Sequence, residues 1–268
     1  MSEFLSDNKI AWDSIAPIHS KGLEAKRKLI LEDKNFIPIS NVITEYLGKV
    51  CLEGKSCLHL CCNNGFETIG LKRMGASECV GVDFCAYNVD YANELAKRLA
   101  LNTDVSFLEC NVTDKKLTKL LNKKFDVIYL STGSLCWVQD LNALYNNIYN
   151  LLNEGGKVFI YDLHPMCNVI NDNKQMDKDP LLVVNNYFTV EPSTRHSSLD
   201  YISRTSKEKQ TYHLFYHTFS DILQNALNCN LKLAYFDESE IDEANGFSRI
   251  TSLNVHFPLS FCVVFSKN

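Results

Sequence analysis

The sequence has no long hydrophobic run. Its apolar stretches, such as residues 57–62 and 125–130, are far shorter than the roughly 20 residues that a membrane-spanning helix needs. No positively charged segment followed by an apolar one opens the chain, as it would in a secretory leader. We therefore expect a cytoplasmic protein with no membrane partner.

An excess of positive charge is also missing. The formal net charge is −5, whereas proteins that bind DNA or RNA through the phosphate backbone normally present a net basic face. A local basic patch is not excluded by this argument. We expect no nucleic acid partner.

Paired metal-binding cysteines are absent as well. The chain has 11 cysteines, an odd number for a full disulfide framework, and none of them forms a Cys-x-x-Cys pair. Cys57, Cys61 and Cys62 lie closest together, but strand alternation would spread these thiols over both faces of a sheet. We expect buried free thiols and no metal site.

The central part of the sequence alternates between short apolar runs and longer amphipathic ones. Strands separated by helices of 10 to 15 residues are typical of right-handed βαβ units and a parallel sheet, so the predicted fold class is α/β and doubly wound. Gly155 and Gly156 are expected to stop the last helix of this series. The predicted strands are 56–62, 79–84, 104–112, 124–131 and 157–164, and the predicted helices are 67–76, 88–100 and 141–152.

Four segments are expected along the chain, with no repeat or linker between them. Residues 1–48 form an N-terminal helical extension, ending in a helix over 38–47 that Ser40 caps and Gly48 stops. Residues 49–164 form the core. Residues 165–217 form an inserted lid with β-like stretches at 181–191 and 209–218, and residues 218–268 complete the core with a helix over 220–230 and an antiparallel hairpin of strands 231–240 and 257–267.

Polar residues follow the predicted strands at the edge where doubly wound folds bind nucleotides. The first turn keeps only Gly65 of the usual glycines, and an ordinary strand-to-helix turn is the alternative. Asp83, at the end of the second strand, is suited to accept both hydroxyl hydrogens of a ribose, or to cap the next helix. Asn111 could read an adenine edge or make a turn, and Trp137 could line a pocket beyond Ser131 or pack in the core.

Four stretches together resemble the class I S-adenosylmethionine-dependent methyltransferases: residues 58–76, 80–98, 125–141 and 151–165. The resemblance covers about residues 50–165 and implies a Rossmann-like sheet of seven strands with an antiparallel last strand. It implies S-adenosylmethionine as the cofactor and S-adenosylhomocysteine as the product. By this resemblance, Cys61, Asn63 and Gly65 line the methionine and ribose side, Asp83 holds the ribose, Asn111 contacts adenine and Ser131 lies near the methionine.

Three positions depart from the family pattern. Cys61 and Asn63 stand where most relatives have glycine, and Asn111 stands where many have aspartate. A nicotinamide-dependent oxidoreductase would need the full glycine triplet and usually a larger second domain. The other alternative is a methyltransferase-like domain that has lost catalysis and acts as a binding or regulatory module. The only feature that favours this alternative is the depleted glycine loop.

Methyl transfer from a sulfonium is an in-line displacement, so the protein mainly aligns the acceptor and excludes water. His164 follows the fifth strand and is the candidate base for the acceptor, although a histidine bonding the backbone of the turn before Pro165 is equally consistent. The acceptor is expected to be a small molecule, and the chain a monomer or homodimer. Candidate acceptor-binding residues, each with aromatic packing as its alternative, are Trp12, His19, Trp137, His196, Tyr212, His213, Tyr216 and His217.

Overall fold

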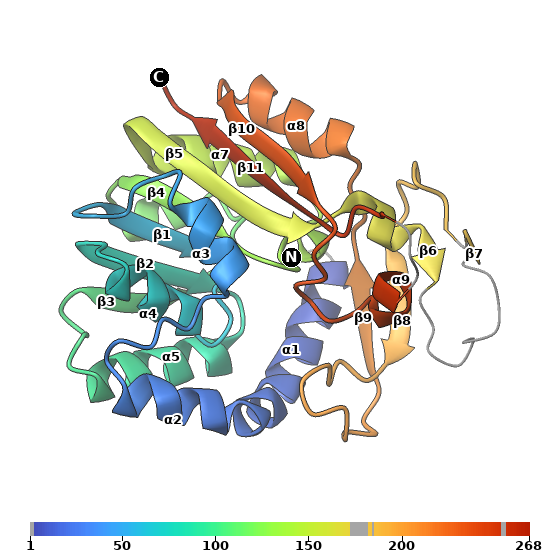
Figure 1. Ribbon diagram of the computed structural model, residues 1–268, viewed down its shortest axis with the longest axis horizontal. Helices are drawn as coiled ribbons and strands as arrows, with labels where there is room; N and C mark the ends of the chain where they lie inside the picture. Colours follow the sequence, from blue (N-terminus) through green and yellow to red (C-terminus); the bar gives the residue numbers. More distant parts are fainter. Residues whose placement is uncertain (1–2, 172–181, 184, 253–255) are drawn as a thin grey trace.

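The computed structural model describes residues 3–171, 182–183, 185–252 and 256–268. A seven-stranded sheet in the order β10-β11-β5-β4-β1-β2-β3 forms the centre (Figure 1). Strands β1 to β5 run parallel, and β11 is antiparallel to both of its neighbours. These strands are β1 (Ser56–Leu60), β2 (Glu78–Asp83), β3 (Val105–Glu109), β4 (Phe125–Leu130), β5 (Leu152–Leu163), β10 (Lys232–Ser239) and β11 (Ser260–Ser266). The predicted α/β sheet with an antiparallel last strand is confirmed.

Helices cover both faces of this sheet. Alternate side chains of each strand point to opposite faces, so Leu58 and Leu60 of β1 pack on one side while Cys57 packs on the other. The first face is covered by α6 (Leu117–Leu121), α7 (Leu141–Leu151) and α8 (Phe219–Asn228). The second face is covered by α3 (Asn41–Leu47), α4 (Phe66–Arg73) and α5 (Ala86–Arg98). Burial on both faces explains why the strands are almost continuously apolar.

A further layer lies beyond the carboxyl end of the sheet. The N-terminal helix α1 (Glu3–Gly22) runs between the sheet and a hairpin formed by β8 (Ser193–Ser197) and β9 (Gln210–Leu214) (Figure 1). Helix α1 packs along β9, and its Asn8 side chain exchanges two hydrogen bonds with the backbone of His213. The remaining elements are α2 (Glu24–Glu32), η1 (Leu135–Trp137), η2 (Pro165–Asn168), β6 (Ile170–Asn171), β7 (Leu182–Val183) and α9 (Ser248–Ser252).

Several predicted boundaries were wrong. Helix α7 ends at Leu151 and the chain enters β5 at once, so Gly155 and Gly156 lie inside the strand; Gly155 has φ +74°, a local irregularity that glycine tolerates. The stretch 181–191 forms a strand only at β7, and the hairpin strand is β8 instead; Leu181 and Val184 lie outside the described residues. The cap at Ser40 and the stop at Gly48 are confirmed, although the helix begins at Asn41. No helix in the described part of the chain is both long and apolar enough to cross a membrane.

Candidate functional site

The loop after β1 has an unusual backbone. Cys61, Asn63 and Gly65 all adopt left-handed φ angles, of +57°, +49° and +77°. Glycine adopts this conformation freely and asparagine tolerates it, whereas for other residues it costs roughly 1–2 kcal/mol. The loop therefore keeps a conformation that suits three alternating glycines although only one is present. Hydrogen bonds from the Cys62 amide to the Val82 carbonyl (3.0 Å) and from the Gly65 amide to the Cys62 carbonyl (3.0 Å) hold it in place.

Gly65 is the one position of this loop where a side chain has no room. A Cβ there would lie 2.6 Å from both the Ala92 Cβ and the Phe107 ring. Its positive φ adds strain to any replacement. Close packing of the α4 start against α5 and β3 therefore requires glycine.

Asp83 ends β2 beside this loop and is 6% exposed. Its two carboxylate oxygens accept the backbone amides of Cys85 (2.9 Å) and Asn63 (2.8 Å). Burial raises the pKa of Asp83 to about 6, against the hydrogen bonds from these amides and from Phe84 and the charge of Lys9. An ionised carboxylate has about four lone-pair sites, so these three amides still leave it capacity to accept a hydroxyl group. Asp83 thus lies beside the loop and is hydrogen-bonded to it, and its ribose role stays a prediction.

The end of β3 is covered by α1. The Lys9 ammonium donates to the Phe84 carbonyl (2.7 Å) and pairs with Glu109 (3.0 Å). Asn111, predicted to contact adenine, uses its side chain on Thr113: its Oδ1 accepts the Thr113 amide and its Nδ2 donates to the Thr113 hydroxyl. In this arrangement Asn111 stabilises its own turn, and adenine contact stays a prediction.

Two carboxylates organise the end of β4. Asp162 of β5 accepts the amides of Gly133 (2.5 Å) and Leu135 (2.9 Å), and so shapes the turn that leads to Trp137. Burial raises the pKa of Asp162, opposed by these backbone hydrogen bonds. A Cβ on Gly133 would meet no atom within 4 Å, so the turn faces open space. The second carboxylate, Glu67 of α4, accepts the Tyr129 hydroxyl (2.9 Å) and is hydrogen-bonded to Ser131.

Five aromatic side chains meet above this edge. Trp12 of α1 lies edge-on to Trp137 with ring centroids 5.2 Å apart, and to His19 at 5.9 Å. Tyr201 contacts His19 (4.5 Å) and Trp12 (6.3 Å), and Tyr212 of β9 contacts Trp137 (5.9 Å). We call these five residues the aromatic cluster. Three elements distant in the sequence thus form one apolar wall.

Tyr201 links this cluster to the loop after β1. The side-chain nitrogen Nδ2 of Asn63 lies 3.5 Å from the Tyr201 hydroxyl. Tyr201 is 51% exposed. The preceding Asp200 accepts the amides of Ser203 and Thr205, among others, and so holds the turn that presents the tyrosine. Tyr201 therefore brings the turn between β8 and β9 into contact with the loop after β1.

His164 has both ring nitrogens engaged. Its Nδ1 accepts the Met166 amide (3.0 Å), which makes it the cap of η2, and its Nε2 lies 2.7 Å from a Glu238 oxygen. Burial lowers the pKa of His164, against the attraction of Glu238. The structure thus gives the ring the turn-stabilising role considered above, and its catalytic role stays a prediction.

The other predicted acceptor-binding residues make none of the ring contacts of the aromatic cluster described above. His213 bonds Asp7 and Thr194, and His217 bonds the Val138 carbonyl. His196 is exposed and bonds Thr211 across the hairpin, and Tyr216 accepts a hydrogen bond from Arg195. These side chains join α1, the hairpin and η1 to one another.

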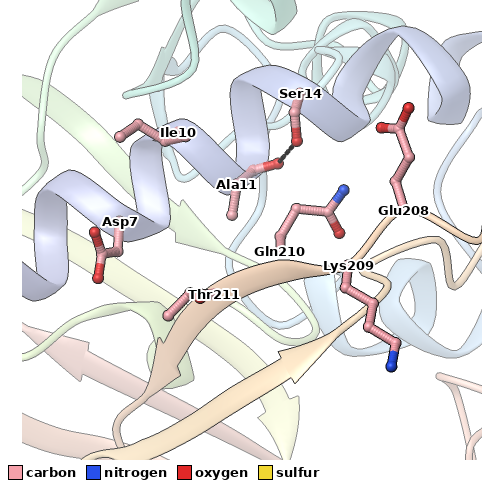
Figure 2. A pocket seen from close by; sticks show the side chains of 8 residues that line it. All are labelled: Asp7, Ile10, Ala11, Ser14, Glu208, Lys209, Gln210 and Thr211. Carbon is pink, nitrogen blue, oxygen red and sulfur yellow. Dashed lines mark hydrogen bonds between the residues drawn. The ribbon is translucent and has the colours of Figure 1, made fainter.

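A surface hollow of about 490 Å³ lies between α1 and the start of β9 (Figure 2). Six of its eight lining residues are polar, and these include Asp7, Ser14, Lys209 and Gln210. Helix α1 contributes to this hollow and to the aromatic cluster, and Asp83 and the loop after β1 take no part in its lining. Within the described residues, no group of three His, Cys, Asp or Glu side chains is arranged to hold a metal ion.

Sequence reasoning missed Glu67, Asp162 and Tyr201. Asp162 had a usable signal, because a carboxylate inside the apolar run 157–164 must find buried donors. Glu67 and Tyr201 sit in ordinary polar surroundings in the sequence. Only the folded chain brings them to the sheet edge.

Comparison with known proteins agrees with this geometry. Residues 58–160 match a family model described as a methyltransferase domain. A 2-phytyl-1,4-naphthoquinone methyltransferase from Nostoc sp. is 30% identical over 113 residues, which are 41% of this chain and 48% of that protein. The methyltransferase phqN from Penicillium fellutanum is 24% identical over 47% of this chain and 37% of its own. The chain thus matches half or less of the length of these curated relatives.

A solved structure shares the fold over most of the chain. The S-adenosylmethionine-dependent methyltransferase from Mesorhizobium loti superposes with a TM-score of 0.61 at 16% identity, over 82% of this chain and 95% of that one. At this identity the likeness concerns the fold alone. It extends beyond the residues that the family model matches.

Proposed function

We propose that this chain, which carries a class I S-adenosylmethionine-dependent methyltransferase domain, transfers a methyl group from S-adenosylmethionine to a small-molecule acceptor. The observation that carries the proposal is Asp83, a buried carboxylate with free acceptor capacity beside a loop that keeps the glycine-type backbone. The related naphthoquinone methyltransferase supports a small molecule as the acceptor.

Asp83 would accept the ribose hydroxyls, and the backbone of Cys61, Asn63 and Gly65 would lie against the ribose and methionine. Ser131 would lie on the methionine side and Asn111 near adenine. When bound, S-adenosylmethionine would supply an electrophilic methyl carbon, which an acceptor atom would attack in line with the C–S bond, so that the sulfur leaves as the thioether of S-adenosylhomocysteine.

The remaining residues would orient the acceptor and exclude water. Trp12, His19 and Trp137 form an apolar wall above the open turn at Gly133. Excluding water there strengthens electrostatic interactions and prevents hydrolysis. Removal of an acceptor proton by His164 would first require its bond to Glu238 to open, and the proposal does not depend on that step.

Ligand binding provides the first test. We expect S-adenosylmethionine and S-adenosylhomocysteine to bind in calorimetry, and NADH not to bind. Both tryptophans of the chain belong to the aromatic cluster, so their fluorescence should change on addition of an acceptor. Binding of NADH without either sulfur ligand would overturn the assignment.

Turnover provides the second test. We expect release of S-adenosylhomocysteine when small aromatic and aliphatic acceptors are supplied with S-adenosylmethionine, and the Trp12→Ala variant should raise KM for the acceptor more than for the cofactor. A cocrystal with S-adenosylhomocysteine should place the sulfur facing the turn at Gly133. A sulfur enclosed by protein side chains on all sides would contradict transfer to an acceptor.

A further inference from the structure

The side chain of Glu67 is directed toward the carboxyl end of β4 and does not extend into solvent. It stands two residues after Gly65, in the first turn of α4, and is half-buried. The Tyr129 hydroxyl donates to its Oε2 (2.9 Å), and Ser131 is its other hydrogen-bond partner. Both partners belong to the carboxyl end of β4. The side chain is thus held between α4 and β4, next to the loop after β1.

Two carboxylates therefore bracket this loop. Strand β1 lies between β4 and β2 in the sheet, so Glu67 stands on the β4 side and Asp83 on the β2 side. Asp83 has backbone amides as donors and Glu67 has hydroxyls. A ligand lying across the loop would meet one carboxylate at each end.

Glu67 also lacks a close positive partner. Among the described residues, no Lys, Arg or His nitrogen lies within 4.0 Å of its carboxylate. Lys26 attracts it from farther away and Glu243 repels it. Taking a carboxylate out of water is costly unless hydrogen bonds and an opposite charge compensate it. A positively charged ligand group would supply the missing partner.

We infer that Glu67 binds the α-ammonium group at the methionine end of the cofactor, while Asp83 holds its ribose. This inference rests on the function proposed above. A ligand with a diol at one end and a cation at the other matches the two carboxylates in kind and in order along the sheet edge. Tyr129 and Ser131 act as positioning residues because their hydroxyls orient the carboxylate.

Three ligands separate this role from general effects on the site. S-adenosylmethionine carries an ammonium and a sulfonium, S-adenosylhomocysteine carries only the ammonium, and 5′-methylthioadenosine carries neither. Calorimetry with the full chain should show that Glu67→Gln lowers the affinity for S-adenosylmethionine and for S-adenosylhomocysteine equally, by about tenfold to a hundredfold. The reason is that a hydrogen bond between two charged groups is lost. Affinity for 5′-methylthioadenosine should change less than about twofold, which also shows that the site is folded.

Two further variants complete the experiment. Glu67→Asp keeps the charge on a shorter side chain and should recover part of the affinity for S-adenosylhomocysteine. Glu45→Gln removes one exposed carboxylate from α3 on the same face of the sheet and should change nothing.

Each other outcome has a distinct meaning. A loss confined to S-adenosylmethionine would assign Glu67 to the sulfonium and overturn the inference, as would equal weakening of all three ligands or no weakening at all. Failure of the unmodified chain to bind any of the three would instead overturn the proposed function.

Discussion

The proposed cofactor side and the proposed acceptor side of this site are built in different ways. On the cofactor side, the decisive hydrogen bond joins residues 20 positions apart, Asn63 and Asp83, and all its elements come from one stretch of alternating strands and helices. On the acceptor side, Asn8 bonds His213 across 205 positions, and His19 bonds the Leu199 carbonyl across 180. The first half is therefore local in the sequence, and the second depends on docking of distant segments.

This difference has a physical consequence. A βαβ unit positions the end of each strand by ladder hydrogen bonds and core packing, so the loop geometry follows from the fold. The aromatic cluster is not positioned by the ladder of the main sheet and is held instead by apolar packing of α1 against β9 and by polar contacts between them. Changes in the two halves should therefore affect different properties.

The largest effect is expected at Gly65. Gly65→Val should destabilise the protein by roughly 3–5 kcal/mol, since the side chain meets Ala92 and Phe107 and the positive φ adds strain. Urea unfolding measures this change. Gly54→Val is the matched control, with φ +69° but no atom within 4 Å of its Cβ, and should cost only about 1–2 kcal/mol. Equal costs at both positions would show that backbone strain alone matters.

The acceptor side should be most sensitive at Asn8. Asn8→Ala leaves the buried amide and carbonyl of His213 without partners and should cost roughly 2–3 kcal/mol. Affinity for S-adenosylhomocysteine should change less than about threefold, because the loop after β1 is untouched. Unfolding and calorimetry test the two statements, with the exposed Asn146→Ala as the control. A large loss of affinity would show that the halves are coupled.

The pH dependence of folding stability should arise in part from the cofactor side, at Asp83. Because the pKa of Asp83 is about 6 in the folded chain and about 4 when unfolded, the folded state holds the proton longer. Stability should therefore fall as pH rises from about 4 to 6, by about 2 kcal/mol, and Asp83→Asn should flatten this part of the profile.

Ligand binding should show the opposite trend. The ionised carboxylate accepts hydroxyl groups better, so S-adenosylhomocysteine should bind about tenfold more tightly at pH 7 than at pH 5. Calorimetry at the two pH values measures this ratio, and the exposed Asp90→Asn variant should keep it. A ratio of one in the unmodified chain would remove Asp83 from the binding site.

The smallest effect is expected where the two halves touch. Tyr201→Phe removes a hydroxyl 3.5 Å from Asn63, a long contact that contributes under about 1 kcal/mol. Affinity for S-adenosylhomocysteine should fall no more than about fivefold, while Tyr201→Ala should also raise KM for the acceptor. If the phenylalanine variant behaved like the alanine variant, the hydroxyl would matter more than the ring.

The alternation of parallel strands and helices, the antiparallel final strand and the places of Gly65 and Asp83 after their strands could be predicted from the residues together with the family resemblance. Hydrophobic periodicity is local information, and the carboxyl ends of parallel strands always share one edge. The end of α7 could not be predicted from Gly155 and Gly156, because Leu152 already pairs with Phe125 in the sheet. Sheet pairing overrode the local glycine signal there.

By itself the sequence determined the core. Apolar runs with the period of a strand alternate with runs that have the period of a helix, and a parallel sheet with helices on both of its faces is the arrangement that buries them all. The tertiary structure alone decided which polar and aromatic side chains serve the site. In the folded chain Glu67 is hydrogen-bonded to Tyr129, and His164 and Asn111 stabilise turns. Trp12 contacts Trp137 and Tyr201 there. Such pairings depend on where distant segments dock, and no period in the sequence encodes them.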